Sequence, residues 1–206
     1  LFRSGEGLTV SQRPLLSVSF AVNFAVFGER PLGYHLTNLL IHIGSAMLVV
    51  SIAKDALAAR PATRGNAVWI STAIGFVWAV HPLASSAVTY IAQRAECMMA
   101  LFFLAALHAA TVYMRGTTSP WVLVAVALFA SASAATKEVA VALPLVVLAY
   151  DRTFVSGTFR KAWVAHAPVQ RELLRHASDE QLRFQQRIEL QRMKGMDVFF
   201  ALRGAE

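Results

Sequence analysis

Two short polar segments interrupt an otherwise apolar chain, and their side chains are of kinds that could do chemistry. HPLASSAVTYIAQRAE carries His81, Arg94 and Glu96, and ATKEVAVALP carries Lys137 and Glu138. A guanidinium offers several donors in a planar fork that suits a phosphate group. Ionisable residues between apolar stretches usually face a water-filled cavity or one another. The two segments are therefore candidates for the walls of a polar cavity at membrane depth, with Arg94 binding a phosphate and Glu96 orienting it.

Each segment also has a simpler explanation. If residues 81–96 are helical, His81, Ser85, Thr89 and Gln93 recur every four residues and form one stripe. Such a stripe is typical of a surface helix at the bilayer boundary whose polar side faces water. The Lys–Glu pair could equally mark a tight turn between helices, with the lysine extending to the headgroups. Spacing alone leaves both readings open.

The composition indicates a membrane protein. Of 206 residues, 56% are hydrophobic and only 15% are charged, and the mean hydropathy of +0.51 is too high for an ordinary soluble domain. The net charge of +7 could suit nucleic acid, but the basic residues lie in short clusters between apolar runs. We find no nucleotide-binding glycine pattern and no zinc-ligand spacing, and the single Cys97 excludes a disulfide framework. The expected partner is the lipid bilayer and not nucleic acid.

The apolar runs predict an all-α bundle of about five spans, since a span needs about 20 mostly apolar residues. The expected spans cover residues 34–53, 66–80, 97–114 and two short halves of 121–150 joined at 136–138. A single bent or re-entrant segment is the alternative for the last stretch. Ser119 before Pro120 marks the expected start of that stretch.

Lysine and arginine predict the topology, because short cytoplasmic loops are enriched in them. The loops at 54–64 and 115–120 and the segment after Tyr150 are basic, so we expect them on the cytoplasmic side. Alternation then places residues 81–96 and 136–138 on the opposite face. Arg94 and Lys137 lie there against the charge bias, each with a neighbouring carboxylate, Glu96 and Glu138, that we expect as its partner.

The chain divides into three predicted parts. Residues 1–33 form an outer-face loop with an amphipathic interfacial helix, and residues 34–152 form the transmembrane bundle. Residues 153–206 form a basic amphipathic cytoplasmic tail, with Leu173, Leu174 and other apolar residues at helical spacing. This tail would lie on anionic lipid or pair with a partner helix, or it would be a solvated, partly disordered end.

Three histidines and an asparagine lie within the predicted spans. His35, Asn38 and His42 share one face of the first span at spacings of three, four and seven. They could begin the polar cavity, but interhelical hydrogen bonding is the more frequent explanation. His108 lies deep in an apolar run, where a satisfied core histidine is expected more often than a ligand.

Three blocks in the same order resemble the membrane part of the transmembrane and tetratricopeptide repeat O-mannosyltransferase-like proteins. These blocks are RPLLSVSFAVNFAVFGERPLGYHLTNLLIH, AVHPLASSAVTYIAQRAECMMALFFLAAL and ATKEVAVALPLVVLAYD. They cover about residues 13–152, and their order and spacing agree with the family. That family is similar in turn to the multispanning glycosyltransferases of fold type C.

The resemblance implies an integral membrane enzyme of the bacterial inner membrane or the endoplasmic reticulum. It would transfer a sugar, with mannose as one candidate, from a polyprenyl-phosphate donor to a protein or other acceptor on the noncytoplasmic face. Arg94 and Lys137 would contact the donor phosphate, Glu96 and Glu138 would hold them, and His81 would line the site. A divalent metal is compatible with the family, but the resemblance assigns it no ligands in this chain.

The resemblance also shows what the chain lacks. The family's acidic motif follows a first span at the start of the outer loop, whereas LFRSGEGLTVSQ contains only Glu6. No tetratricopeptide repeats follow, and the chain is expected to be a truncated copy that is inactive alone, with no catalytic residue assigned. A noncatalytic scaffold, carrier or remnant is the alternative function.

Overall fold

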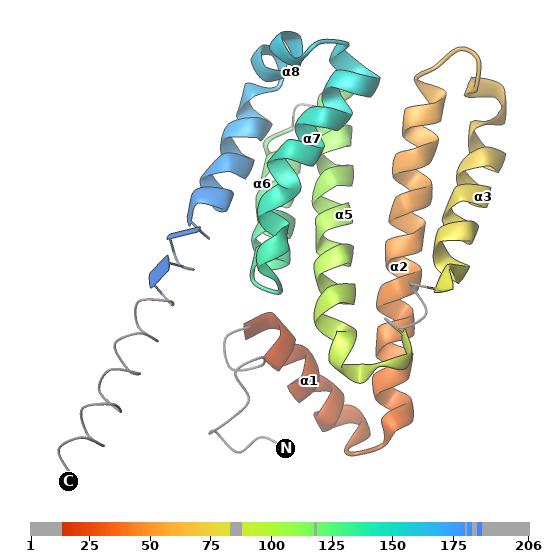
Figure 1. Cartoon of the computed structure of the whole chain (residues 1–206), viewed down its shortest axis with the longest axis vertical. Coiled ribbons are helices and arrows are strands. Elements are labelled where there is room, and N and C mark those ends of the chain that lie inside the picture. The colour runs from red at the N-terminus through yellow and green to blue at the C-terminus, as the bar shows by residue number, and fades with distance from the viewer. Residues whose placement is uncertain (1–13, 83–87, 118, 180, 183–184, 187–206) are drawn as a thin grey trace, which may run out of the picture.

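The computed structural model describes the chain over most of its length. The described residues are 14–82, 88–117, 119–179, 181–182 and 185–186, without the side chains of Ala92 and Glu138. Over these residues the chain is almost entirely helical and contains no strand. The longer helices run alternately up and down in one bundle (Figure 1), which confirms the predicted all-α class.

Three helical stretches are long and apolar enough to cross a membrane. They are α2 (Pro31–Ala58), α5 (Arg94–Met114) and the stretch Val139–Ser156. At 1.5 Å per residue, the 28 residues of α2 extend about 42 Å and the 21 residues of α5 about 31 Å. The spans predicted at 34–53 and 97–114 lie inside α2 and α5.

Two shorter apolar helices complete the bundle. α3 (Ala67–Val80) has 14 residues and α6 (Pro120–Ala134) has 15. Proline at the first position of α6 suits its fixed φ and missing N–H, and Ser119 before it has extended backbone but makes no side-chain cap. These bounds confirm the predicted helix starts near residues 66 and 120.

The predicted break at residues 136–138 is present. α6 ends at Ala134, and a short 3₁₀ helix (η3, Glu138–Ala142) leads into α7 (Leu143–Asp151) and a π-helical turn (η4, Arg152–Ser156). The chain therefore reverses direction here, which excludes a single bent segment. α6 is shorter than the stretches able to cross a membrane, so the choice between two spans and a re-entrant segment stays a prediction.

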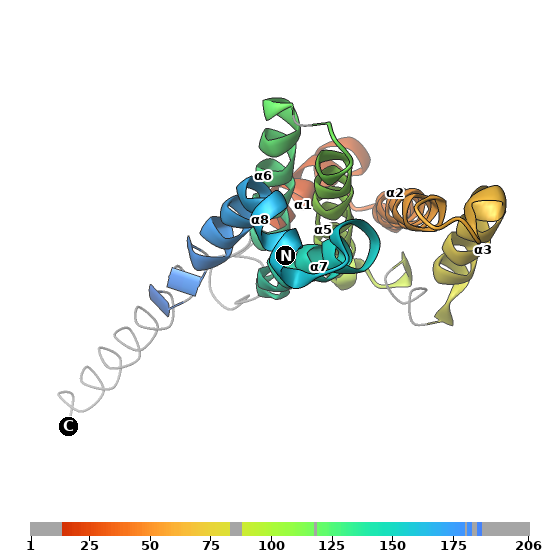
Figure 2. The same ribbon diagram turned by 90° about the horizontal axis from the view of Figure 1, so that it is seen from above.

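α5 forms the centre of the bundle and packs against α2, α6 and α7 (Figure 2). Its inward side includes small residues at the closest contacts, with Ala106 and Ala110 fully buried in one cluster with Val126 of α6 and Val147 of α7. Small residues let helix backbones approach closely, which is the usual basis of helix association in membranes.

α3 lies on the outer side of α2 (Figure 2) and depends on a glycine for its packing. A Cβ atom built on Gly75 would lie 2.2 Å from Cγ2 of Val50. Valine has one strongly preferred χ1 rotamer in a helix, so moving its methyl group away would be costly, and glycine suits this position.

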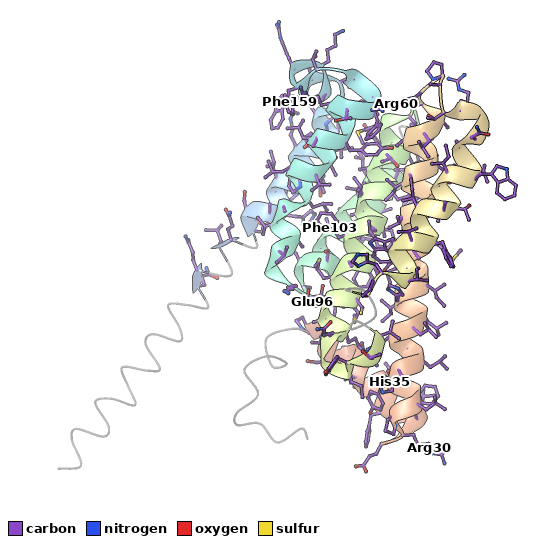
Figure 3. The ribbon with its side chains drawn as sticks, turned by 45° about the vertical axis from the view of Figure 1, so that its right-hand side comes forward. Arg30, His35, Arg60, Glu96, Phe103 and Phe159 are labelled. Atoms are coloured by element: carbon purple, nitrogen blue, oxygen red, sulfur yellow. The ribbon has the colours of Figure 1, made fainter. Side chains whose placement is uncertain are left out.

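The connections gather at two ends of the bundle in the way the charge pattern predicted. At one end Arg115 pairs with Asp55 at 3.1 Å, and the Arg60 guanidinium lies 5.0 Å from the centre of the Phe154 ring. Figure 3 shows Arg60 at this end and Glu96 at the other. The grouping of loops is confirmed, and the assignment of one end to the cytoplasm stays a prediction.

The outer surface of the bundle is apolar. Leu32, Trp69 and Trp121 expose 78 to 79% of their surface, and α2, α3 and α6 expose many other apolar side chains. Soluble monomers rarely expose continuous apolar surface of this kind. The surface therefore suits contact with lipid and an integral membrane location.

The N-terminal helix α1 (Pro14–Phe27) is present, but its outward face is apolar instead of polar. It contains no charged residue, and Val18, Val22 and Val26 are exposed while Asn23 is buried. Glu29 and Arg30 lie beyond its C-terminal end.

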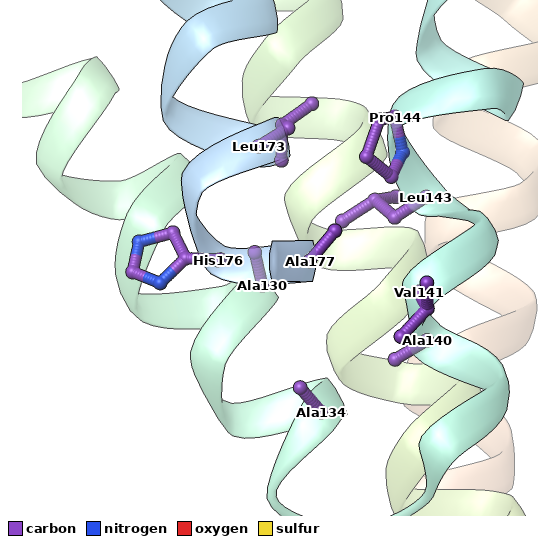
Figure 4. A pocket seen from close by; sticks show the side chains of 9 residues that line it. All are labelled: Ala130, Ala134, Ala140, Val141, Leu143, Pro144, Leu173, His176 and Ala177. Carbon is purple, nitrogen blue, oxygen red and sulfur yellow. The ribbon is translucent and has the colours of Figure 1, made fainter. Parts of the chain in front are cut away.

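The C-terminal segment packs on the bundle over its first part. After the short α8 (Phe159–Ala165), residues 167–179 are helical, and Leu173 joins the buried core. Ser131 of α6 contacts Nδ1 of His176 at 3.1 Å. Figure 4 shows Leu173 and His176 among the side chains lining a small apolar pocket against α6 and α7. Leu173 and Ala177 of the predicted stripe thus lie against α6 and α7, whereas Leu174 is exposed. Phe184, Ile188 and Met193 lie outside the described residues, so the partner of the tail stays a prediction.

Candidate functional site

The segment at 81–96 is not one continuous helix. α3 ends at Val80, His81 and Tyr90 both have extended backbone, and a 3₁₀ turn (η2, Ile91–Gln93) precedes α5. Residues 83–87, including Ser85, lie outside the described residues. The predicted stripe from His81 to Gln93 is therefore wrong, because the extended backbone at Tyr90 breaks the helical period.

The polar face of α2 holds this segment in place through its backbone. Three side chains of α2 reach backbone carbonyl oxygens, two in the chain between α3 and α5 and one in the last turn of α3. They join His35 Nδ1 to Val88 at 3.2 Å, Asn38 Nδ2 to Tyr90 at 3.3 Å, and His42 Nε2 to Ala79 at 3.0 Å. This confirms interhelical hydrogen bonding as the role of these residues. Carbonyl groups that no helix satisfies receive their donors in this way.

Arg94, at the start of α5, is fully buried and holds three helices together. Its Nε donates to Asn38 Oδ1 at 2.8 Å, and its terminal nitrogens donate to the carbonyl oxygens of Tyr34 at 3.0 Å and Ser19 at 3.4 Å. The guanidinium also lies 4.5 Å from the centre of the Phe20 ring. None of these partners is a carboxylate, so the predicted pairing of Arg94 with Glu96 is wrong.

Glu96 pairs with Lys137 across the bundle. The Lys137 ammonium donates to Glu96 Oε1, and the two side chains are 26% and 45% exposed. The predicted pairing of Lys137 with Glu138 came from their adjacency in sequence, but Lys137 has extended backbone that turns it toward α5. The side chain of Glu138 lies outside the described residues. The Glu96–Lys137 pair is thus half-exposed, and it joins the start of α5 to the end of α6.

Two hydroxyl residues position Lys137 and were not singled out from the sequence. Ser133 Oγ donates to the carbonyl oxygen of Met99 on α5 at 3.1 Å, and Thr136 Oγ1 donates to the Ser133 carbonyl at 2.6 Å. Both residues are fully buried. Serine and threonine near a helix end commonly bond to nearby backbone carbonyls, and this was the available signal.

The other two histidines predicted from the sequence, His81 and His108, lie at the end of α3 and within α5. His81 is exposed at the end of α3, beside α2 and away from the centre of the bundle. His108 Nδ1 is buried and has no hydrogen-bond partner within the described part of the chain, so the expectation of a satisfied core histidine is wrong for this atom. Among the described residues, no three His, Cys, Asp or Glu side chains are grouped to hold a metal ion.

Comparison with known proteins finds several relatives, and each is named as a protein O-mannosyl-transferase. The chain is 35% identical over 151 residues to the protein O-mannosyl-transferase TMTC2 of Homo sapiens, a match that covers 71% of this chain and 17% of that protein. It is 32% identical over 147 residues to Tmtc2 of Drosophila melanogaster, covering 68% of this chain and 15% of that protein. It is also 31% identical over 96 residues to TMTC3 of Homo sapiens, covering 47% and 10%.

The chain spans less than a fifth of the length of these relatives. No protein-family model and no solved structure matches it.

Proposed function

The chain belongs to the TMTC-like family of protein O-mannosyl-transferases, and from this premise we propose that it forms part of a membrane glycosyltransferase. The identity of 35% over 71% of the chain carries the proposal. The half-exposed Glu96–Lys137 pair at one end of the bundle supports it, because an ionic group at such a place needs a polar surrounding.

The proposed reaction transfers mannose from a polyprenyl-phosphate donor to a hydroxyl group of a protein on the noncytoplasmic face. The acceptor oxygen bonds to the anomeric carbon, the bond from that carbon to the phosphate oxygen breaks, and a base takes the hydroxyl proton. Negative charge develops on the departing phosphate, and a fixed cation stabilises that charge. We assign the base to no residue of this chain.

Lys137 is the proposed cation for the donor phosphate. Its ammonium is partly exposed and is held by Glu96, so a phosphate can approach it without unfolding the bundle. His81 and Glu138 remain proposed as residues that line the site.

Arg94 has a different proposed role from the one its sequence suggested. Its side chain has no exposed surface and gives three donors to protein oxygens, so a phosphate would have to displace them. We propose that Arg94 is a positioning residue, which fixes the first turn of α5 and with it Glu96.

Binding of a labelled polyprenyl-phosphate mannose to the full chain in lipid vesicles tests the proposal. Loss of one charge-assisted contact to phosphate costs about 1.5–3 kcal/mol, so Lys137→Ala should weaken binding roughly 10- to 100-fold. Arg115→Ala is the matched control, because Arg115 is a basic residue paired to a carboxylate at the other end of the bundle. Wild-type binding by Lys137→Ala would overturn the site assignment.

Transfer of the label separates the two functions that the family resemblance allows. Label transferred to an added acceptor protein by the wild-type chain would support a catalytic role. Donor binding without transfer would support the noncatalytic alternative. In that case the chain has only the part of the site that binds the donor.

A further inference from the structure

A short excursion of the chain leaves the bundle at the end opposite Glu96 and Lys137. It covers residues 157–165 and begins at Gly157, whose φ of 78° lies in the left-handed region that favours glycine. α8 (Phe159–Ala165) follows directly, after the stretch Val139–Ser156 that is long enough to cross the membrane. The excursion lies at the end of that stretch (Figure 1), where a stretch that crossed the membrane would reach the membrane surface.

One buried carboxylate fixes both ends of the excursion. Asp151 has no exposed surface, and its Oδ1 accepts from Ser156 Oγ at 2.7 Å. Its Oδ2 lies 2.6 Å from Nδ1 of His166, which can donate to it. Ser156 precedes the excursion and His166 follows it, so these two contacts attach α8 to the bundle at both of its ends.

α8 turns apolar side chains outward as well as inward. Ala162 is fully buried against the bundle, whereas Phe159, Trp163 and Val164 are 51%, 47% and 71% exposed. Figure 3 shows Phe159 at the same end as Arg60. Tryptophan at the end of a membrane-spanning stretch is typical of the headgroup region, and both tryptophan and phenylalanine are typical of the apolar face of interfacial helices. The outward face of α8 thus suits the boundary between headgroups and acyl chains.

The excursion and the turn before it, residues 152–165, carry basic side chains and no acidic one. Arg160 and Lys161 are exposed on α8, and Arg152 lies with its guanidinium 4.4 Å from the centre of the Phe159 ring. Residues 152–165 contain no Asp or Glu, and the nearest carboxylate, Asp151, is buried in its own contacts. The field around α8 is therefore positive on a partly apolar surface.

We propose that α8 binds the headgroups of anionic phospholipids, with Phe159, Trp163 and Val164 seated among the lipids and Arg160, Lys161 and Arg152 contacting the phosphates. Apolar and charged contacts are both needed. The aromatic side chains place α8 at the boundary between headgroups and acyl chains, and the basic side chains select negative headgroups. This inference does not depend on the glycosyltransferase proposal, since it concerns the opposite end of the bundle.

Quenching of Trp163 by brominated lipid tests the proposal. The full chain is reconstituted in nanodiscs of phosphatidylcholine and phosphatidylglycerol, with bromine on the acyl chains of one lipid at a time. The Trp163 signal is obtained by subtracting the emission of Trp163→Phe, since the chain has four tryptophans. We expect brominated phosphatidylglycerol to quench Trp163 more than brominated phosphatidylcholine at equal mole fraction.

The basic residues should account for that preference. A cation near a membrane surface contributes about a fivefold preference for anionic lipid, so Arg160→Ala with Lys161→Ala should greatly reduce the difference between the two quenching values, and Arg152 should keep part of it. Arg171→Ala with Arg175→Ala is the matched control, because both arginines are exposed on the next helical segment and the charge change is equal. This control should keep the preference.

Two results would overturn the proposal. One is equal quenching of Trp163 by both brominated lipids in the wild-type chain, and the other is an unchanged preference in the Arg160 and Lys161 double variant. The exchanged variant, Arg160→Lys with Lys161→Arg, keeps both charges and should keep the preference. If the exchanged variant lost it as well, a specific protein or ligand contact would replace the lipid surface as the explanation.

Discussion

Replacing Arg94 with lysine tests whether this residue holds the bundle together or only supplies charge. Lysine keeps the positive charge but cannot reproduce the planar fork that reaches three oxygens at once. The guanidinium now reaches Asn38 at 2.8 Å, Tyr34 at 3.0 Å and Ser19 at 3.4 Å. An ammonium in the same cavity can keep one of the two short bonds, and the other oxygen would lose its donor.

The expected loss of stability follows from those bonds. A hydrogen bond to a charged group contributes roughly 1.5–3 kcal/mol, so losing one of the two short bonds should cost about 2 kcal/mol. For a chain of about 200 residues, each kcal/mol corresponds to roughly 2–4 °C in Tm. We therefore expect the Tm of Arg94→Lys in detergent to fall by about 4–8 °C.

Thermal unfolding followed by size-exclusion chromatography measures this change. Arg30→Lys is the matched control, because Arg30 is exposed at the same end of the bundle and should leave the Tm unchanged. A wild-type Tm for Arg94→Lys would refute the reasoning and show that charge alone is needed at this position. A double variant with Asn38→Leu adds a check, since residues that share a bond should not have additive effects.

Three further substitutions test other contacts by the same measurement. Asp151→Asn removes the charge that His166 faces and should lower the stability by about 1–3 kcal/mol, and an unchanged Tm would contradict the two-point attachment of α8. His42→Phe keeps an aromatic ring but loses the bond to the Ala79 carbonyl of α3, and it should cost about 1 kcal/mol or less, as interhelical bonds in membranes usually do. Gly75→Val should separate α3 from α2 and lower the Tm, whereas Gly65→Ala, with open space around it, should not.

The helices could be predicted from the sequence because their signals are local. A run of apolar residues, a proline at a first helical position and a basic loop each lie within a few residues of the boundary they mark. The starts of α3 and α6 and the break at 136–138 were therefore predicted to within a few residues. The grouping of the loops at two ends followed from alternation alone.

The partners of the charged side chains could not be predicted in this way, because they depend on how helices are packed. Adjacency in sequence suggested Arg94 with Glu96 and Lys137 with Glu138, but residues one or two apart on a helix do not face each other. The observed partners are 41 residues apart for Lys137 and 56 residues apart for Arg94 and Asn38. The polar residues of α2 gave a usable signal, since their shared face predicted interhelical bonding.

The two kinds of charged contact at this end of the bundle depend on each other. Arg94 and Glu96 lie in the first turn of α5, so the contacts that fix Arg94 also fix the direction in which Glu96 leaves the helix. Glu96 in turn holds Lys137 at the end of α6. Arg94→Lys should therefore weaken donor binding less than Lys137→Ala, and it should do so together with a lower Tm. Lys137→Ala should weaken binding with little change in Tm, because a half-exposed ion pair contributes little to stability.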